Sequence, residues 1–202
     1  MEQIQRGVGY FMLKTQHKKS EYTLNPNEIN QLINHSKSFR DRLILKCLYF
    51  GGMRVGEVAR LEVQDLDFNR NVIHIRNSKR GKTRTIPFID SGFKSDLKHF
   101  IGPKTKNKIF DIGKRMIQHI VSHTAENINL KHPDPTSKHI NPHLLRHSIA
   151  RHLKSSGYPL EWIQKFLGHS KMETTADSYG TLSLEEMQMI LIKKSGDTLL
   201  LQ

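Results

Sequence analysis

The stretch Pro142-His143-Leu144-Leu145-Arg146-His147 is followed along the chain by Leu167-Gly168-His169 and by Tyr179. Asn141 and Pro142 predict the first residues of a helix, so His143 and Arg146 share one helix face. Arginine is a permanent cation whose planar fork fits a phosphate, and histidine donates, accepts or transfers protons. Tyrosine can act as a nucleophile. The pattern therefore indicates a site at which a phenol attacks a phosphodiester without a metal.

His143 and His147 also have the four-residue spacing of two metal ligands on a helix. The helical zinc motif, however, has a glutamate directly after the first histidine, whereas residues 144–146 are Leu-Leu-Arg. An arginine between the two ligands would repel a dication. We therefore expect no metal here, and a solvated basic helix face is the simpler alternative to an anion site.

The overall charge of the chain also indicates an anionic partner. The 202 residues include 32 Lys+Arg and 19 Asp+Glu, which gives a formal net charge of +13 and a pI near 9.9. Such a chain is attracted to polyanions, to nucleic acid first and to an acidic membrane surface second. The alternative is a basic protein whose charge serves only its solubility.

Two features of the sequence bear on the location of the protein. No stretch approaches the roughly 20 apolar residues that span a bilayer, and the N-terminus lacks the apolar core of a signal peptide. Cys47 is the only cysteine and lies in the apolar run 43–50, so we expect it in the core rather than as a nucleophile. A lone thiol suits a reducing compartment. The sequence predicts a cytoplasmic protein without a membrane partner.

The distribution of apolar residues predicts a single compact domain over residues 23–195. A basic N-terminal arm or linker remnant (1–22) precedes it, and a short C-terminal tail (196–202) follows it. Asn25-Pro26-Asn27-Glu28 predicts the start of the first helix, with an N-cap, a proline at the first position and a capping glutamate. A short helix with Glu57, Val58 and Leu61 is expected after Arg54. Further helices are expected at about 38–50, 91–100, 113–127, 142–156, 159–167, 171–179 and 184–194.

Alternating β-branched residues at 72–76 and 83–88 predict a hairpin, and residues 108–110 predict a third short strand. The predicted fold class is therefore α+β, mainly α-helical, with a small antiparallel sheet of two or three strands.

From Arg70 to Ile89 the chain has six Lys or Arg residues and no acidic residue. A basic hairpin can enter a DNA groove or bring a lysine to a phosphate, the alternative being an exposed turn with ordinary solvating charges.

The chain resembles the catalytic domain of the tyrosine recombinases, the phage-type integrases, from about Tyr22 to Lys194. This resemblance implies the breaking-rejoining fold of that domain and an enzyme that acts on double-stranded DNA. Five matches in the same order carry it: Gly51-Gly52-Met53-Arg54-Val55-Gly56-Glu57, Thr85-Ile86-Pro87, His143-Leu144-Leu145-Arg146-His147, Leu167-Gly168-His169-Ser170, and Thr174-Thr175 before Tyr179.

The resemblance implies a role for each matching side chain. Arg54 and Arg146 would hold the non-bridging oxygens of the scissile phosphate, where charge builds up in the transition state. His143 would act as a general acid and base, and His169 would donate a hydrogen bond to the phosphate. Tyr179 would be the nucleophile and form a 3′-phosphotyrosyl link, which conserves bond energy and needs no cofactor.

The remaining assignments complete the predicted site. Lys79 would protonate the leaving 5′ oxygen, with Lys82 as a rival because hairpin turns vary in length. Glu57 would support the site structurally, and His147 would be a supporting residue. The basic side chains expected to contact DNA are Arg76, Arg80, Lys82, Arg84, Lys138 and Arg151.

Two features depart from the family pattern. Tyr179 follows His169 by ten residues, where the family typically has about nine, and one extra residue turns a helix by roughly 100°. A bulge or a loop that carries the tyrosine must absorb the difference. The family also has an N-terminal helical domain that clamps DNA, whereas only about 22 residues precede the match here, so an isolated catalytic region should bind DNA weakly.

The predicted activity is site-specific recombination, such as integration or excision of a mobile element, in a prokaryotic or viral setting. A catalytically silent DNA-binding module of the same fold and a type IB topoisomerase-like relaxase are the alternatives. The family implies a homo-tetramer on DNA. The apolar stripe Leu184, Met187, Ile190 and Leu191 would then either pack on the chain's own core or dock into a neighbouring protomer in trans.

Overall fold

The computed structural model describes residues 22–76, 83–103, 107–133, 139–168 and 182–195. The predicted arm before Tyr22, the tail after Ser195 and the predicted helix 171–179 lie outside these ranges. The described α-helices are α1 (Pro26–Asn34), α2 (Phe39–Tyr49), α3 (Val55–Val58), α4 (Ser91–Ile101), α5 (Lys114–Asn127), α6 (Pro142–Ser155), α7 (Leu160–Leu167) and α8 (Leu184–Ser195). The strands are β1 (Leu66–Asp67), β2 (Val72–Arg76) and β3 (Thr83–Pro87), and a 3-10 helix, η1, spans Val63–Asp65.

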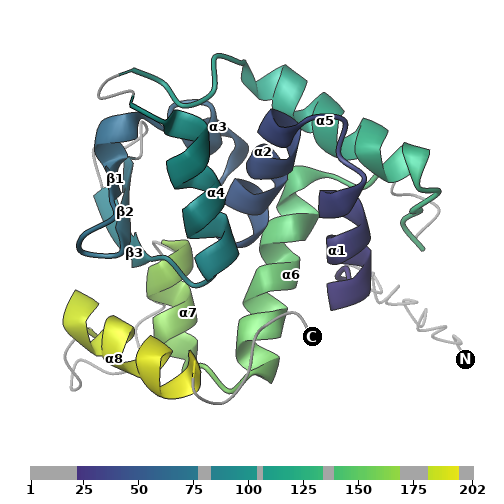
Figure 1. The fold of residues 1–202 in the computed structure, drawn as a ribbon. Coiled ribbons are helices and arrows are strands. Elements are labelled where there is room, and N and C mark those ends of the chain that lie inside the picture. The colour runs from purple at the N-terminus through teal and green to yellow at the C-terminus, as the bar shows by residue number, and fades with distance from the viewer. Residues whose placement is uncertain (1–21, 77–82, 104–106, 134–138, 169–181, 196–202) are drawn as a thin grey trace, which may run out of the picture.

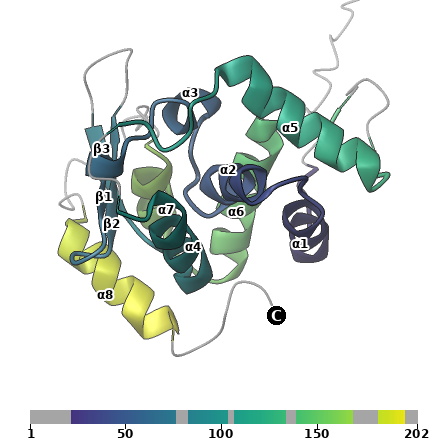
Figure 2. The same ribbon diagram turned by 45° about the horizontal axis from the view of Figure 1, so that its top comes forward.

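Helices α2 and α6 form the centre of the molecule (Figure 1). These two helices pack on each other. Helices α1, α4 and α5 contact α2, and α7 contacts α6. The sheet lies at one end and α1 at the opposite end, and the view turned by 45° shows the same separation (Figure 2). The predicted class, α+β and mainly helical, is confirmed.

Local sequence explains where α1 and α6 begin and which face α6 buries. The capping box predicted at Asn25 and Glu28 is present in α1. Helix α6 starts at Pro142, where the Asn141 side chain accepts hydrogen bonds from two backbone N–H groups. Its apolar face, Leu145, Ile149 and Leu153, is fully buried. Cys47 is buried in α2, as expected of a core residue.

The three strands form an antiparallel sheet in the order β1-β2-β3. The predicted hairpin β2–β3 is confirmed, but the third strand is Leu66–Asp67, so the prediction of a strand at 108–110 was wrong. Lys108 makes one isolated bridge to Glu62, and pairing stops there because the chain turns into η1 at Val63. The side chains of Ile109 and Phe110 are buried in the core, which accounts for the apolar residues that predicted a strand here.

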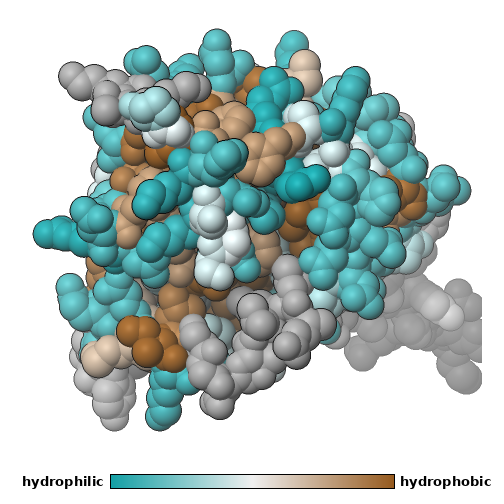
Figure 3. Space-filling model, in the orientation of Figure 1, coloured by the Kyte–Doolittle hydropathy of each residue, from teal (hydrophilic) through white to brown (hydrophobic). Residues whose placement is uncertain are grey.

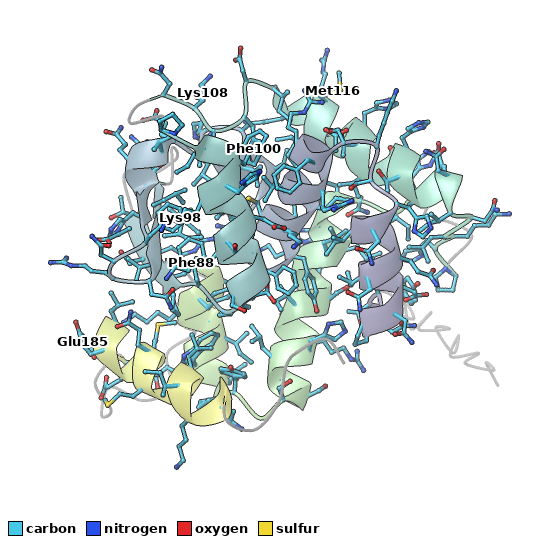
Figure 4. The ribbon with its side chains drawn as sticks, in the orientation of Figure 1. Phe88, Lys98, Phe100, Lys108, Met116 and Glu185 are labelled. Carbon is cyan, nitrogen blue, oxygen red and sulfur yellow. The ribbon has the colours of Figure 1, made fainter. Side chains whose placement is uncertain are left out.

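Aromatic contacts fix the sheet against the helices. Phe68 stacks on Phe88 with ring centroids 5.7 Å apart, Phe88 contacts Phe93 of α4 at 5.8 Å, and Phe93 contacts Phe50 at 6.1 Å. Figure 4 shows Phe88 close to α4, whereas Lys108 and Glu185 lie at the periphery. These contacts connect the ends of β1 and β3 to the end of α2, which the turn Gly51-Gly52-Met53 joins to Arg54.

Helix α8 packs on its own chain. Met187 and Leu191 are buried, and the Trp162 indole donates to the Met187 carbonyl at 3.1 Å. The predicted capping box at Ser183 and Glu186 is present. Met189 and Ile192 on the same helix are exposed, and Figure 3 shows hydrophobic side chains at the surface in this region. No described helix combines the length and the apolar character needed to cross a membrane.

Candidate active site

Arg54 stands at the start of α3, directly after the turn Gly51-Gly52-Met53. Its backbone N–H and its Nη1 donate to the Glu57 carboxylate at 2.7 and 3.0 Å. Its Nη2 donates to the Gly168 carbonyl at 3.3 Å. The side chain is 43% exposed, so Arg54 is held at its base and remains accessible. The short helix ends at Val58, and Leu61, which was expected within it, is a buried residue beyond its end.

Two glycines allow this turn to approach the end of α7. Gly52 has φ +51°, and a Cβ there would lie 2.8 Å from Leu167 Cδ2 and 3.0 Å from Phe166 Cε1. Gly168 ends α7 in the left-handed conformation, as its place in the sequence predicts. Segments more than a hundred residues apart in sequence therefore meet at this point.

Arg146 is buried at the junction of α6, the glycine turn and α7. Its guanidinium donates to the carbonyl oxygens of Gly52 and Leu167. Burial, followed by the positive charges of Arg54 and Arg84, lowers the pKa of Arg146 to about 9. The group is still charged at neutral pH, but its surroundings oppose that charge.

Glu57 is the carboxylate that holds this cluster together, and it is 4% exposed. Both of its oxygens accept from Arg84, at 2.8 and 3.0 Å, in addition to the bonds from Arg54. Burial alone would raise the pKa of Glu57, but the bonds and charges of Arg84 and then Arg54 outweigh it and hold the pKa below its ordinary value. Glu57 is therefore an anion at neutral pH, and the supporting role predicted for it agrees with its position.

We call Arg54, Glu57, Arg84 and Arg146 the inner cluster. Arg54 and Arg84 share the Glu57 carboxylate, and Arg146 lies near enough for the charges of all three to influence its pKa. With three guanidinium groups and one carboxylate, the inner cluster carries an excess of positive charge. The same three arginines donate to three successive carbonyls at the end of α7, those of Phe166, Leu167 and Gly168. An added anion would relieve the repulsion among the arginines, and a phosphate has the geometry that arginine recognises.

His143 and His147 lie on the first turns of α6, three residues before and one residue after Arg146, and both are exposed. Their rings meet edge to face with centroids 4.4 Å apart. Among the described residues no group of three or more His, Cys, Asp or Glu side chains could hold a metal ion. The ring of His143 is thus accessible, as the predicted acid-base role requires.

Of the other predicted site residues, some are described by the structure and the rest lie outside the described ranges. Arg151 is exposed on α6, and Arg76 is bound to Glu62 and Asp65 on the outside of the sheet. The remaining ones lie outside the described residues: Lys79, Arg80, Lys82, Lys138, His169 and Tyr179. Their roles, and the effect of the ten-residue spacing, stay predictions.

Sequence reasoning placed Arg84 among the DNA contacts, but the structure places its guanidinium on Glu57 and the Phe166 carbonyl. The signal that identifies this position is the alternation of β3. Arg84 shares a sheet face with Ile86, whose side chain is fully buried. A basic residue two positions from a core residue on the same strand points to the same buried face. It therefore needs a partner inside the protein.

Known proteins match this chain in sequence and in structure. The profile described as "Phage integrase family" matches residues 22–186. The chain is 32% identical over 158 residues to the tyrosine recombinase XerA of Pyrococcus furiosus, which covers 76% of this chain and 55% of the relative. It is 33% identical over 176 residues to the tyrosine recombinase XerC of Staphylococcus aureus, which covers 81% and 58%. The chain thus spans about half the length of the curated relatives it matches.

Solved structures share the fold. A crystal structure of XerA recombinase matches with a TM-score of 0.65 and 22% identity, over 85% of this chain and 63% of that one. XerH site-specific recombinase bound to its difH substrate matches with a TM-score of 0.61 and 22% identity, over 77% and 51%. The lambda integrase catalytic core matches with a TM-score of 0.58 and 20% identity, over 73% and 94%.

Proposed function

Because the chain belongs to the phage integrase family of tyrosine recombinases, we propose that it cuts and rejoins double-stranded DNA at a specific site. The observation that carries this proposal is the inner cluster, in which two arginines share one buried carboxylate and a third arginine lies close to them. Such an excess of fixed positive charge favours a phosphate, and it favours the more highly charged transition state of phosphoryl transfer still more.

The proposed reaction exchanges one ester for another. The Tyr179 oxygen attacks the phosphorus of the scissile phosphate, its proton passes to a base, and the bond to the 5′ oxygen breaks. Lys79 gives a proton to that oxygen, while His143 and His169 complete the contacts to the phosphate. Rejoining reverses these steps with a 5′-hydroxyl as the nucleophile. No bond energy is lost, so the chemistry requires neither ATP nor a metal.

Arg54 and Arg146 would act on the non-bridging oxygens. Arg146 is fixed by two backbone carbonyls and cannot reorganise when charge develops, which makes it effective at stabilising a transition state. Arg54 is 43% exposed and can reach a bound DNA from the surface. The predicted contacts of Arg76, Arg151 and the basic hairpin turn would position the duplex through its backbone.

The experiment is a trapping assay with a nicked suicide duplex in EDTA. The duplex carries a site recovered by selection of randomised DNA on the protein. We expect a covalent protein–DNA adduct that is lost in Tyr179→Phe and retained in Tyr158→Phe. Tyr158 is a suitable control because it is 7% exposed and packs on Trp162 with ring centroids 4.6 Å apart.

Other outcomes favour other functions. Binding without an adduct would favour a silent DNA-binding module, and relaxation of supercoiled plasmid without recombinant products would favour a topoisomerase-like relaxase. A requirement for a metal would overturn the mechanism. An adduct retained in Tyr179→Phe would move the nucleophile to another residue.

We also propose that the active form is a homo-tetramer on two duplexes, with α8 able to contact a neighbouring protomer. The exposed side chains of Met189 and Ile192, 61% and 72% accessible, support such a contact. Substituting both by glutamate should lower the mass of the protein–DNA assembly measured by light scattering. An unchanged mass would count against a role of α8 in assembly.

A further inference from the structure

Arg84 lies on the buried face of the hairpin, within β3. It pairs across the sheet with Ile75, and the next pair on the same face joins Ile73 and Ile86. These three isoleucines are at most 2% exposed. Because side chains alternate along a strand, Arg84 points to the interior with them. A charged side chain in this position needs a partner inside the protein.

The partners of Arg84 are a carboxylate and a helix end. Its Nη1 and Nη2 donate to the two Glu57 oxygens at 2.8 and 3.0 Å, and its Nε donates to the Phe166 carbonyl at 3.0 Å. Each guanidinium nitrogen therefore has an acceptor within the protein. The side chain is 12% exposed, against 43% for Arg54.

The backbone of Gly168 also lies against the Arg84 side chain. A Cβ at Gly168 would lie 2.6 Å from Arg84 Cδ and 3.1 Å from its Nη1. The backbone of the last turn of α7 thus rests directly on the stem of Arg84. Helix ends expose carbonyls that lack an intrahelical partner and carry partial negative charge, so a buried arginine stabilises this one.

The same contacts connect Arg84 to Arg54. Glu57 Oε1 accepts from both Arg84 and Arg54, and Arg54 also donates to Gly168. Moving Arg84 would therefore move the carboxylate that orients Arg54 and the helix end that both arginines contact. A lysine could supply the charge but not the three-way bridge, because an ammonium has no planar fork.

We propose that Arg84 is a positioning residue, which braces the end of α7 against Glu57 and so sets the orientation of Arg54, rather than a DNA contact. The consequence for cleavage rests on the proposed function, whereas the bracing itself does not. Loss of Arg84 should loosen the end of α7 and slow the covalent step without weakening the electrostatic attraction to DNA.

The test compares Arg84→Gln, Arg84→Lys and the control Arg40→Gln. Arg40 is 45% exposed, pairs with Asp41 at the start of α2, and lies outside the inner cluster. Amide hydrogen exchange at residues 166–168 should accelerate at least about tenfold in both Arg84 variants, because this turn loses its brace. It should not change in Arg40→Gln. Arg84→Lys keeps the charge and the aliphatic stem, so it carries the test if Arg84→Gln does not fold.

DNA binding separates a brace from a phosphate contact. The affinity for a labelled duplex of mixed sequence is measured over a salt series. A brace predicts an unchanged salt slope in Arg84→Gln, whereas loss of one phosphate contact makes the slope shallower by about 0.9. Unchanged hydrogen exchange together with a shallower slope would overturn the proposal.

Adduct formation supplies the functional readout. The rate of the covalent step should fall by about tenfold or more in both variants, since small misplacements of catalytic groups have large effects on rate. The acidic limb of its pH profile should move to higher pH in Arg84→Gln, because Glu57 loses its main hydrogen-bonding cation. If the wild-type protein forms no adduct, the proposed function fails, while hydrogen exchange and the salt slope still decide the role of Arg84.

Discussion

The hairpin β2–β3 contributes one arginine to a charged cluster on each of its two faces. On the outer face, Arg76 pairs with Glu62 at 2.8 Å and with Asp65 at 2.8 Å, and its side chain is 45% exposed. On the inner face, Arg84 shares the buried Glu57 with Arg54, and Arg146 lies close to both. The outer cluster has two carboxylates for one cation, and the inner cluster has one carboxylate for three cations.

The pKa shifts follow this difference in charge balance. The bonds of Arg76 to Glu62 and then to Asp65 raise the pKa of its guanidinium. Burial, followed by Arg54 and Arg84, lowers the pKa of Arg146. The cation of the outer cluster is thus matched by two carboxylates, whereas the inner cluster, with one carboxylate for three cations among the described residues, would be stabilised by an added anion. Arginine is therefore matched by carboxylates on the outer face of the hairpin and is in excess over them on the inner face.

Removal of Arg146 should have the largest effect. Arg146→Ala leaves the carbonyls of Gly52 and Leu167 without a donor, so the free energy of unfolding should fall by about 2–4 kcal/mol in urea titrations. The rate of adduct formation should fall by at least about 10²-fold. Lys154→Ala, an exposed position on the same helix, is the stability control. Equal effects of the two variants would contradict the structural role assigned to Arg146.

Neutralising the shared carboxylate should have the second largest effect. Glu57→Gln keeps the shape of the side chain but leaves Arg54 and Arg84 without their counter-charge, so the free energy of unfolding should fall by about 2–3 kcal/mol at pH 7. Urea unfolding measures this change, with Glu185→Gln on the surface of α8 as the control. A stability equal to wild type would mean that the inner cluster does not depend on Glu57.

The stability difference between wild type and Glu57→Gln should also depend on pH, which is a smaller and more specific effect. The pKa of Glu57 is below its ordinary value of 4.5 in the folded protein. Its contribution to stability is therefore fully present above that value and is lost as the pH falls through the folded-state pKa. The stability difference between wild type and Glu57→Gln should stay constant from pH 7 to about 5 and shrink below about 4. A difference that does not change with acidity would show that the Glu57 charge is not stabilised by its arginines.

Disruption of the outer cluster should have the smallest effect. Arg76→Ala should lower the free energy of unfolding by less than about 1 kcal/mol, because exposed ion pairs contribute little and salt screens them. Thermal unfolding at low and high salt measures it. A loss as large as that of Glu57→Gln would remove the distinction between the two faces.

Local signals in the sequence were sufficient to predict most of the fold. The caps at Asn25, Asn141 and Ser183 gave helix starts that the structure contains, and alternation gave β2 and β3. The strand expected at 108–110 was wrong because apolar residues in a short run serve a core as well as a strand, and only tertiary contacts distinguish them. Strand β1, Leu66–Asp67, has only two residues, so it is too short to show the alternation of side chains that predicts a strand.

The site was predicted less completely than the fold. Arg54, Glu57 and Arg146 were found through their resemblance to a family pattern, and the structure brings these three together. Arg84 was assigned to DNA because charge alone marks a basic residue in a basic hairpin. Its partners, Glu57 and Phe166, are 27 and 82 residues away, and no local pattern reports contacts at such separations.

The most direct test of the inner cluster as a phosphate site removes charge from the DNA instead of the protein. Adduct formation by Arg54→Ala and Arg76→Ala is compared on duplexes with a normal or a methylphosphonate scissile linkage, which lacks one negative oxygen. If Arg54 neutralises that oxygen, its loss should slow cleavage at least about tenfold more on the phosphodiester than on the methylphosphonate. Arg76→Ala should show no such difference. Equal losses on both duplexes for Arg54→Ala would contradict the proposal that the inner cluster binds the scissile phosphate.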